Sequence, residues 1–193
     1  MQTGQEVPKT EHPTIFYEVL QSSLPPQEKS LQRIGDEAQT IIGAGVETTA
    51  WALSIASYHI IANPLILTTL RAELSTVLPS VSSAPGAVDW LTLEKLPYLT
   101  ACITESIRLS YGLSHRNPRV SHAPLKYKEW TIPAGVPVGM NIVDVQHDES
   151  VFPDSHAFLP ERWLGSPKTA GGKPLTRYFV AFGKDARSCL GIK

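Results

Sequence analysis

Residues 182–191 read FGKDARSCLG, a glycine-containing loop with one cysteine, called here the cysteine loop. Cysteine binds metal ions and attacks substrates as the thiolate, and the cationic neighbours Lys184 and Arg187, with exposed backbone N–H groups, favour that ionised form. Gly191 keeps the backbone slim where a flat group could press against it. A lone cysteine is more often structural. The rest of the sequence must therefore decide the role of Cys189.

The composition is that of a globular chain. Its 193 residues suffice for one ordinary domain or two small ones, and 42% of them are hydrophobic. The net charge of −1 gives no electrostatic reason to expect a nucleic acid as partner. Two cysteines, Cys102 and Cys189, are too few for a disulfide framework, and a single bridge between them stays open.

The sequence gives no sign of a targeting segment. Residues 1–13 are polar and lack the basic-then-apolar pattern of a signal peptide, so we expect neither signal nor anchor in this chain. The stretch 41–62 is long enough to cross a bilayer, but Glu47, Thr48 and Ser54 put polar groups in its middle, which is costly in lipid. We therefore predict a long buried helix there and not a membrane span.

The first part of the chain has helical periodicity. A short helix is expected within residues 14–29, ended by the break at Leu24-Pro25-Pro26. The pattern resumes and continues over residues 30–61, which at roughly 1.5 Å per residue gives a helix of about 48 Å. Asn63-Pro64 then provides a cap and a first-turn proline for a helix that runs to about Leu78.

The second part changes from helix to short extended segments. After a loop over residues 79–88, a helix begins at Pro97 and ends at Gly112, with Cys102 on its buried side. Extended segments are expected at residues 125–128, 130–132 and 136–143. After Asp148 the many prolines and glycines predict ordered coil. We predict a mainly α fold with a small antiparallel β-sheet.

A first group of chemically interesting residues lies inside the long helix. Ala44, Glu47 and Thr48 share one helical face, and Thr49 follows them. A threonine hydroxyl can bond back to the carbonyl four residues earlier, which bends a helix and opens a slot for water. An acid, an alcohol and a water together form a proton relay. The alternative is a helix with small packing residues and a solvated glutamate.

A second group combines a helix with the coil. Glu105 and Arg108 lie three residues apart and therefore on one helical face, and residues 160–163, Pro-Glu-Arg-Trp, add Arg162 from the coil. Such pairs are common and mostly solvated when they occur alone. One glutamate held by two arginines would lock the coil to the helix.

These motifs, in this order, resemble those of the carboxy-terminal half of a cytochrome P450, a haem-thiolate monooxygenase, and look most like the fungal microsomal branch. The resemblance covers residues 30–193. It implies a partial cytochrome P450 haem domain over residues 30–193, preceded at 1–29 by a helix and linker.

The resemblance implies roles around haem b. Cys189 would be the axial thiolate ligand of the haem iron, whose electron donation favours O–O cleavage, with Phe182 packed beside it.

The resemblance also implies that two arginines would bind the haem propionates. Arg187 would face one propionate and Arg119 the other, a role that suits the planar guanidinium. His115 and Arg116 are alternatives to Arg119.

Residues away from the ligand also acquire roles from the resemblance. Glu47 and Thr48 would deliver protons on the distal side, whereas Glu105, Arg108 and Arg162 would form a structural triad. Substrate would contact four further residues, namely Ala44, Thr49, Leu113 and Ser114.

The implied reaction inserts one oxygen atom from dioxygen into a hydrophobic small molecule, with electrons from NADPH through a reductase. The intact relative would sit at the endoplasmic reticulum membrane through an N-terminal anchor absent here. Three departures from the family pattern bear on this chain. Asp185 replaces a glycine in a tight turn expected to need positive φ, the chain stops at Lys193 before the helix expected after the cysteine loop, and the earlier half of a full family member is absent. The alternative hypothesis is therefore a truncated, non-catalytic remnant with weak or no haem binding.

Overall fold

The computed structural model describes residues 14–78 and 88–192. The chain divides into two compact units, one ending at Glu47 and one beginning at Thr48, and each is described by itself. The loop predicted at residues 79–88 lies, except for Val88, outside the described residues, as do residues 1–13.

The first unit contains a short helix, α1 (Ile15–Gln21), and a 3-10 turn, η1 (Pro26–Lys29). The Thr14 hydroxyl caps α1 by accepting the Tyr17 N–H at 3.2 Å. The expected helix over 14–29 is therefore shorter than predicted, because the proline pair lets only a 3-10 turn form after Ser22.

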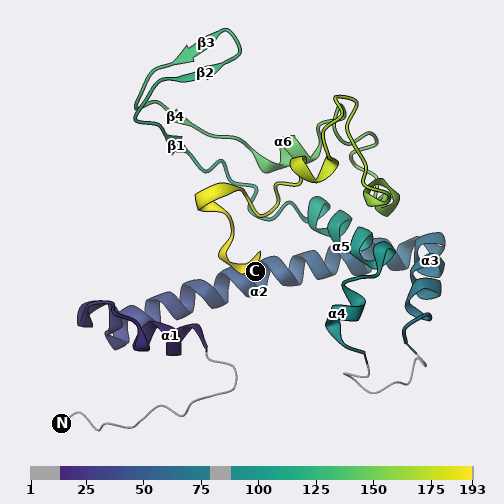
Figure 1. The fold of residues 1–193 in the computed structure, drawn as a ribbon, viewed down its shortest axis with the longest axis horizontal. Coiled ribbons are helices and arrows are strands. Elements are labelled where there is room, and N and C mark those ends of the chain that lie inside the picture. Colours follow the sequence, from purple (N-terminus) through teal and green to yellow (C-terminus); the bar gives the residue numbers. More distant parts are fainter. Residues whose placement is uncertain (1–13, 79–87, 193) are drawn as a thin grey trace. The chain divides into compact units, whose positions relative to one another are not determined.

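The long helix forms as predicted. It is α2 (Leu31–Ala62), 32 residues long, and it continues from the first unit into the second (Figure 1). The prediction that it is buried was wrong, because none of its residues is buried in the described chain. In the second unit it packs through its last turns, where Ile55 and Ile60 contact the hydrophobic core and the His59 ring stacks on Phe158.

Among the described residues, no single helix is long and apolar enough to span a membrane. The helices α2 and α3 (Pro64–Leu74) reach that length and hydropathy only as a pair, which is bent by 104°.

The predicted cap starts α3. The Asn63 side chain accepts the N–H groups of Leu65 and Ile66 at 3.1 and 3.4 Å, with Pro64 in the first turn. The helix ends at Leu74, four residues earlier than predicted, and turns follow.

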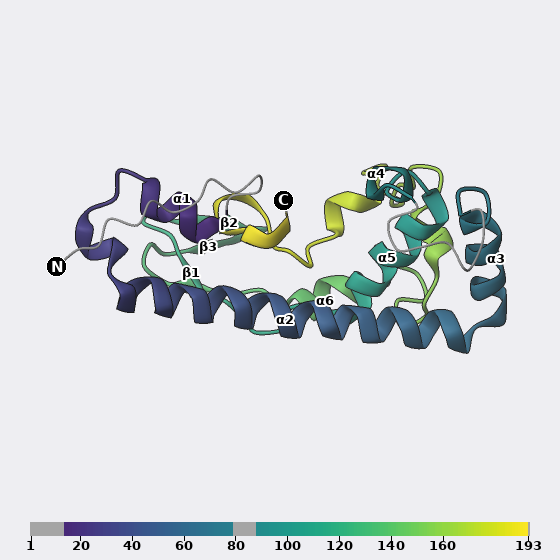
Figure 2. The same ribbon diagram turned by 90° about the horizontal axis from the view of Figure 1, so that it is seen from below.

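A second helix, α5 (Pro97–Ser110), lies beside α3 (Figures 1 and 2). A short helix, α4 (Trp90–Leu93), precedes it. The residue before α5 is Leu96, which cannot cap; instead the Glu73 carboxylate of α3 accepts the N–H groups of Tyr98 and Leu99, both at 2.8 Å. The two helices are thus joined by an acid at a helix amino terminus.

The core of the second unit forms between these helices. It contains the buried side chains Ile66, Leu70, Tyr98, Cys102, Leu109 and Phe158. Cys102 is fully buried, as predicted. α5 ends in two left-handed residues, Tyr111 (φ 63°) and Gly112 (φ 56°).

The strands form two antiparallel pairs, which agrees with the predicted small antiparallel sheet. β1 (Arg119–Val120) pairs with β4 (Pro137–Val138), and β2 (Leu125–Tyr127) pairs with β3 (Trp130–Ile132) as a hairpin (Figure 1). The extended segment predicted over 136–143 was wrong after Val138.

The error has a local cause in the capping residue of the next helix. Asn141 accepts the Val143 N–H at 3.1 Å and thereby starts α6 (Ile142–Gln146).

The tract after Asp148 is ordered coil, as predicted, interrupted by single 3-10 turns. These turns are η2 (Pro160–Trp163), η3 (Leu175–Tyr178), η4 (Asp185–Arg187) and η5 (Leu190–Ile192). The turn η2 packs against α5, which brings the coil onto the helix that carries Glu105.

Candidate functional site

The structure brings Glu105, Arg108 and Arg162 together around one buried carboxylate. Oε1 of Glu105 accepts Arg108 Nη2 at 2.8 Å and Arg162 Nε at 3.0 Å. Oε2 accepts Arg108 Nε at 2.8 Å, so Arg108 binds in a bidentate manner. The Leu159 N–H (3.1 Å) and the Trp163 indole N–H (2.9 Å) complete the set of donors.

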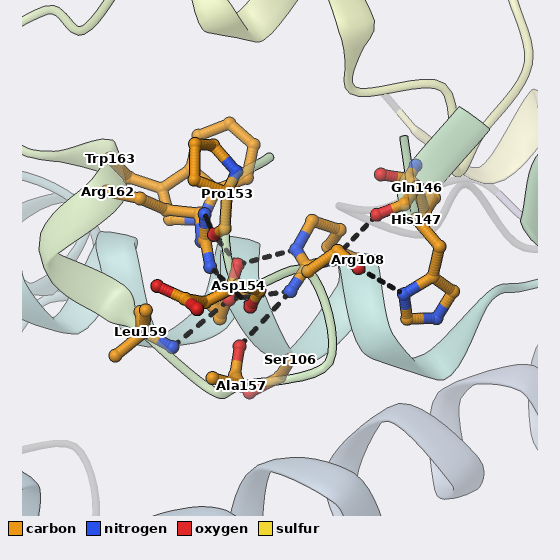
Figure 3. Close-up of polar contacts among 12 residues, drawn as sticks. Ser106, Arg108, Gln146, His147, Pro153, Asp154, Ala157, Leu159, Arg162 and Trp163 are labelled. Atoms are coloured by element: carbon orange, nitrogen blue, oxygen red, sulfur yellow. Dashed lines mark hydrogen bonds and ion pairs between the residues drawn. The ribbon is translucent and has the colours of Figure 1, made fainter. Parts of the chain in front are cut away.

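The guanidinium of Arg108 reaches beyond the carboxylate (Figure 3). It donates to the backbone carbonyls of Gln146 at 2.8 Å and Ala157 at 3.3 Å, and its Cζ lies 5.3 Å from the centroid of the Phe152 ring. These contacts tie α5 to the end of α6 and to the coil.

Arg162 binds a further part of the coil. It donates to the carbonyls of Pro153 at 2.9 Å and Asp154 at 3.2 Å (Figure 3), and Asp154 is held in a left-handed conformation with φ 52°. The two arginines therefore fix several irregular segments that have no ladder of backbone hydrogen bonds of their own.

The charge of Glu105 is maintained in spite of burial. Burial would by itself raise the pKa of Glu105, but the hydrogen bonds and positive charge of Arg108, with the N–H groups of Leu159 and Trp163, outweigh it and lower that pKa. The carboxylate is therefore ionised at neutral pH and each guanidinium has a counter-charge.

Trp163 is part of this network and was missed in the sequence analysis, where only its neighbour Arg162 was assigned a role. The signal was present, because an indole N–H that leaves solvent needs an acceptor, and Glu105 had spare lone pairs.

The cysteine loop is closed by backbone hydrogen bonds. The Cys189 N–H donates to the Phe182 carbonyl at 2.7 Å, and the Gly183 N–H donates to Val180 at 2.9 Å. The left-handed conformation falls on Gly183, with φ 69°. Asp185 opens the 3-10 turn η4 directly after this bend.

The two cysteines have opposite environments. Both are free, so the bridge left open between them does not form; Cys102 is buried and Cys189 is exposed. Burial, followed by the charges of Glu161 and Glu73, raises the pKa of Cys102 to about 12, which leaves it a neutral thiol. Cys189 is therefore the cysteine available to a ligand.

The two arginines expected near a cofactor lie on separate elements. Arg187 belongs to η4 and is exposed, and Arg119 begins β1, where it is exposed and donates to the Pro118 carbonyl at 3.2 Å. The alternative Arg116 lines an open cavity of about 600 Å³ with Asn141 and Tyr178.

The predicted relay and substrate residues are accessible. Glu47 and Thr48 are adjacent in α2 and exposed, as are Ala44 and Thr49. Leu113 and Ser114 are exposed in the segment that follows α5.

A chain of hydrogen bonds lies next to the buried network. His147 contacts the Tyr111 hydroxyl through Nε2 at 2.7 Å and the Ser155 hydroxyl through Nδ1 at 3.1 Å, and Ser155 donates to Glu149 at 2.7 Å. The His147 ring also stacks on His156 with centroids 3.9 Å apart. The pKa of His147 is lowered by burial and then by the charge of His156.

The side chain of Gln146, next to His147 in the sequence, is buried without a hydrogen-bond partner among the described residues. Both polar side-chain atoms of Gln146 are buried without a hydrogen bond in the described residues. Within residues 14–78 and 88–192, no group of three or more His, Cys, Asp or Glu side chains is arranged to hold a metal ion.

The chain is similar to known proteins over nearly its whole length. The sequence model of the family described as Cytochrome P450 matches residues 7–193. Cytochrome P450 monooxygenase sdnE of Sordaria araneosa is 52% identical over 183 residues, which cover 94% of this chain and 35% of that protein. Cytochrome P450 monooxygenase orf4 of Eupenicillium brefeldianum is 48% identical, over 93% of this chain and 36% of its own length. The chain thus spans about a third of the length of these relatives.

Proposed function

The chain belongs to the cytochrome P450 family, and on this premise we propose that the intact enzyme is a haem-thiolate monooxygenase. It inserts one oxygen atom from dioxygen into a hydrophobic small organic molecule, with electrons from NADPH through a reductase at the endoplasmic reticulum membrane. The relatives' printed names, cytochrome P450 monooxygenase, support the reaction class.

The accessibility of Cys189 carries the proposal. A metal ligand must be deprotonated and reachable, and of the two cysteines only Cys189 is exposed, whereas Cys102 is a neutral thiol in the core. We assign Cys189 as the residue whose thiolate would hold the iron of haem b. When bound, haem supplies the activation of dioxygen.

The residues around Cys189 fit a flat, anionic group. A Cβ added to Gly191 would lie 3.8 Å from Cys189 Sγ, so the missing side chain leaves the sulfur uncovered on that side. The exposed guanidinium groups of Arg187 and Arg119 have the chemistry to bind two propionates. Phe182, half-buried at the start of the loop, is assigned to pack beside the ligand.

Residues on α2 are assigned to proton delivery. Glu47 provides an exposed carboxylate and Thr48 a hydroxyl at the next position, so together they could hold a proton and pass it on to dioxygen chemistry at a bound haem. Ala44 and Thr49 flank this pair, and Leu113 and Ser114 follow α5; we assign these four to the substrate pocket.

The test is the spectrum of the reduced protein with carbon monoxide. Full-length enzyme is produced with haem, reduced with dithionite and exposed to carbon monoxide, and the Soret band is recorded for the wild type and for Cys189→Ser and Cys102→Ala. The proposal expects the red-shifted band of a thiolate-ligated haem in the wild type and in Cys102→Ala, and its loss in Cys189→Ser. A wild-type spectrum without that band, or a Cys189→Ser protein that keeps it, contradicts the assignment.

A second measurement tests turnover. Microsomes that contain the enzyme and its reductase are supplied with NADPH, oxygen-18 gas and a panel of apolar small molecules, and products are analysed by mass spectrometry. One oxygen-18 atom per product molecule supports the monooxygenase reaction, whereas products with no label or with two labelled atoms oppose it.

A further inference from the structure

Trp163 lies between the buried charge network and the cysteine loop. Its indole N–H is held by Glu105 Oε2 at 2.9 Å (Figure 3), and its side chain is half-buried. The Phe152 ring lies tilted against it, with centroids 5.9 Å apart and planes at 51°. The indole is thus anchored at a fixed point of α5 and cannot rotate without breaking a bond to a buried charge.

From Trp163, a series of aromatic rings leads to the cysteine loop. The Phe179 ring meets Trp163 edge to face, with centroids 5.7 Å apart and planes at 80°. The Phe182 ring meets Phe179 in the same manner, at 6.2 Å and 67°. Edge-to-face pairs are directional, so the orientation of each ring constrains the next.

The series ends at the backbone of the ligand residue. Phe182 carries the carbonyl that accepts the Cys189 N–H at 2.7 Å, and Gly183, in the left-handed conformation, turns the chain directly after it. This bond fixes the backbone at Cys189 and therefore the direction in which its side chain leaves the loop.

A second contact fixes the same segment from α5. A Cβ added to Gly112 would lie 3.0 Å from the Ala181 carbonyl oxygen, so the backbone after α5 packs directly against the residue that precedes Phe182. The segment that leads into the cysteine loop is therefore held at two points. One is the backbone packing against Gly112, just after α5, and the other is the series of rings that begins at Trp163.

We propose that Trp163 is a positioning residue for the Cys189 ligand: by fixing Phe179 and Phe182, it keeps the Phe182 carbonyl on the Cys189 N–H. The proposal rests on the haem-thiolate function proposed above. A loop whose backbone can shift would let water reach the sulfur, and hydrogen bonds to a ligating sulfur weaken its donation to iron because they withdraw electron density. Loosening the series should therefore make the haem reduction potential more positive and raise the share of haem that lacks the thiolate ligand.

The experiment separates this role from general support of the fold. Four variants of the full-length enzyme are compared, Trp163→Leu, Trp163→Phe, Phe179→Leu and Phe152→Leu. Phe152 is the matched control, because its fully buried ring touches Trp163 and Arg108 but lies outside the series that leads to the loop. For the folded fraction of each, the share of haem with the thiolate-type carbon monoxide band and the haem reduction potential are measured.

The proposal expects Trp163→Leu and Phe179→Leu to raise the non-thiolate share several-fold and to shift the potential positively. Phe152→Leu should lose stability with an unchanged spectrum and potential. Trp163→Phe, which keeps a ring but loses the N–H, should lose stability and retain most of the thiolate band. If Trp163→Leu does not fold, Phe179→Leu still tests the series.

Two results overturn the inference. Equal spectral changes in Phe152→Leu and Phe179→Leu would show a general effect of core loss, and unchanged spectra in both Trp163→Leu and Phe179→Leu would show that the rings do not reach the ligand. In either case a wild-type thiolate band leaves the proposed function standing. A wild type without that band overturns both.

Discussion

Replacing Glu105 by glutamine is expected to destabilise the protein by about 3–5 kcal/mol, the range for removing one partner of a buried ion pair. The carboxylate and the Arg108 side chain are both fully buried, and the Arg162 side chain is only 8% exposed. Glutamine keeps the shape of the side chain but not its charge. Its NH₂ group would face the N–H groups of Arg108, Arg162 or Trp163, which are themselves donors. Two guanidinium groups would then remain buried without a counter-charge, and the Trp163 indole would lose its charged acceptor.

The loss is large compared with the total stability of a protein domain, which is about 5–15 kcal/mol. With a urea dependence of roughly 1–3 kcal/mol per molar, the midpoint of unfolding should fall by at least about 1 M. The measurement is urea unfolding of the full-length protein followed by far-ultraviolet circular dichroism. Arg108→Ala should cost a similar amount, because it leaves Glu105 with one arginine instead of two.

Glu161→Gln is the matched control. Glu161 is an exposed carboxylate that accepts the Tyr98 hydroxyl at 2.8 Å, and glutamine retains an acceptor oxygen there, so the cost should stay within about 1 kcal/mol. Equal losses for Glu105→Gln and Glu161→Gln would refute the reasoning, because the buried network would then contribute no more than one part-buried hydrogen bond.

Three further predictions concern other sites. Thr48→Ala should raise the hydrogen peroxide formed per NADPH in the intact enzyme because the relay loses its hydroxyl, and a Thr49→Ala variant with the same leak would argue against that role. Gln146→Met should raise the urea midpoint, since it removes a buried amide with no described partner, and a lower midpoint would show that a water pairs with the amide. Burial and then the charge of His156 lower the pKa of His147 below its unfolded value of 6.5. The contribution of His147 to stability is therefore full above pH 6.5 and is lost as the pH falls through its folded-state pKa. The variant His147→Gln should show a smaller fall of the urea midpoint over this pH range, and the same fall in variant and wild type would contradict the prediction.

Local rules of helix formation were sufficient to predict most of the helices. The periodicity predicted α2 to within a residue at each end, and Asn63-Pro64 and Pro97 marked the starts of α3 and α5. The same rules failed for α6, because an asparagine within an apolar run was read as part of a strand although it caps a helix. Capping is a property of one side chain and two N–H groups, which hydrophobic periodicity does not register.

Burial was harder to predict than helicity. The apolar content of α2 suggested a buried helix, but burial depends on what packs against each face, and no residue of α2 is buried in the described chain. The hydrophobic pattern of a helix indicates which face tends to be buried, but it does not identify the element that packs against that face.

The candidate site was partly predictable for a related reason. Glu105 and Arg108 lie on one helical face by spacing alone, and Arg162 was connected with them through its motif. Trp163 was missed, and so were the carbonyls that satisfy the guanidinium groups. These partners come from coil, whose path depends on the network itself, so no local rule specifies them.

The central claim is that Cys189 is the sulfur ligand of the haem iron. Iron K-edge X-ray absorption of the resting full-length enzyme tests it most directly, because the first coordination shell distinguishes sulfur from nitrogen and oxygen. The wild type and Cys102→Ala should both show one sulfur neighbour, and Cys189→Ser should show none. A sulfur neighbour that persists in Cys189→Ser, or one that is absent from the wild type, would contradict the claim.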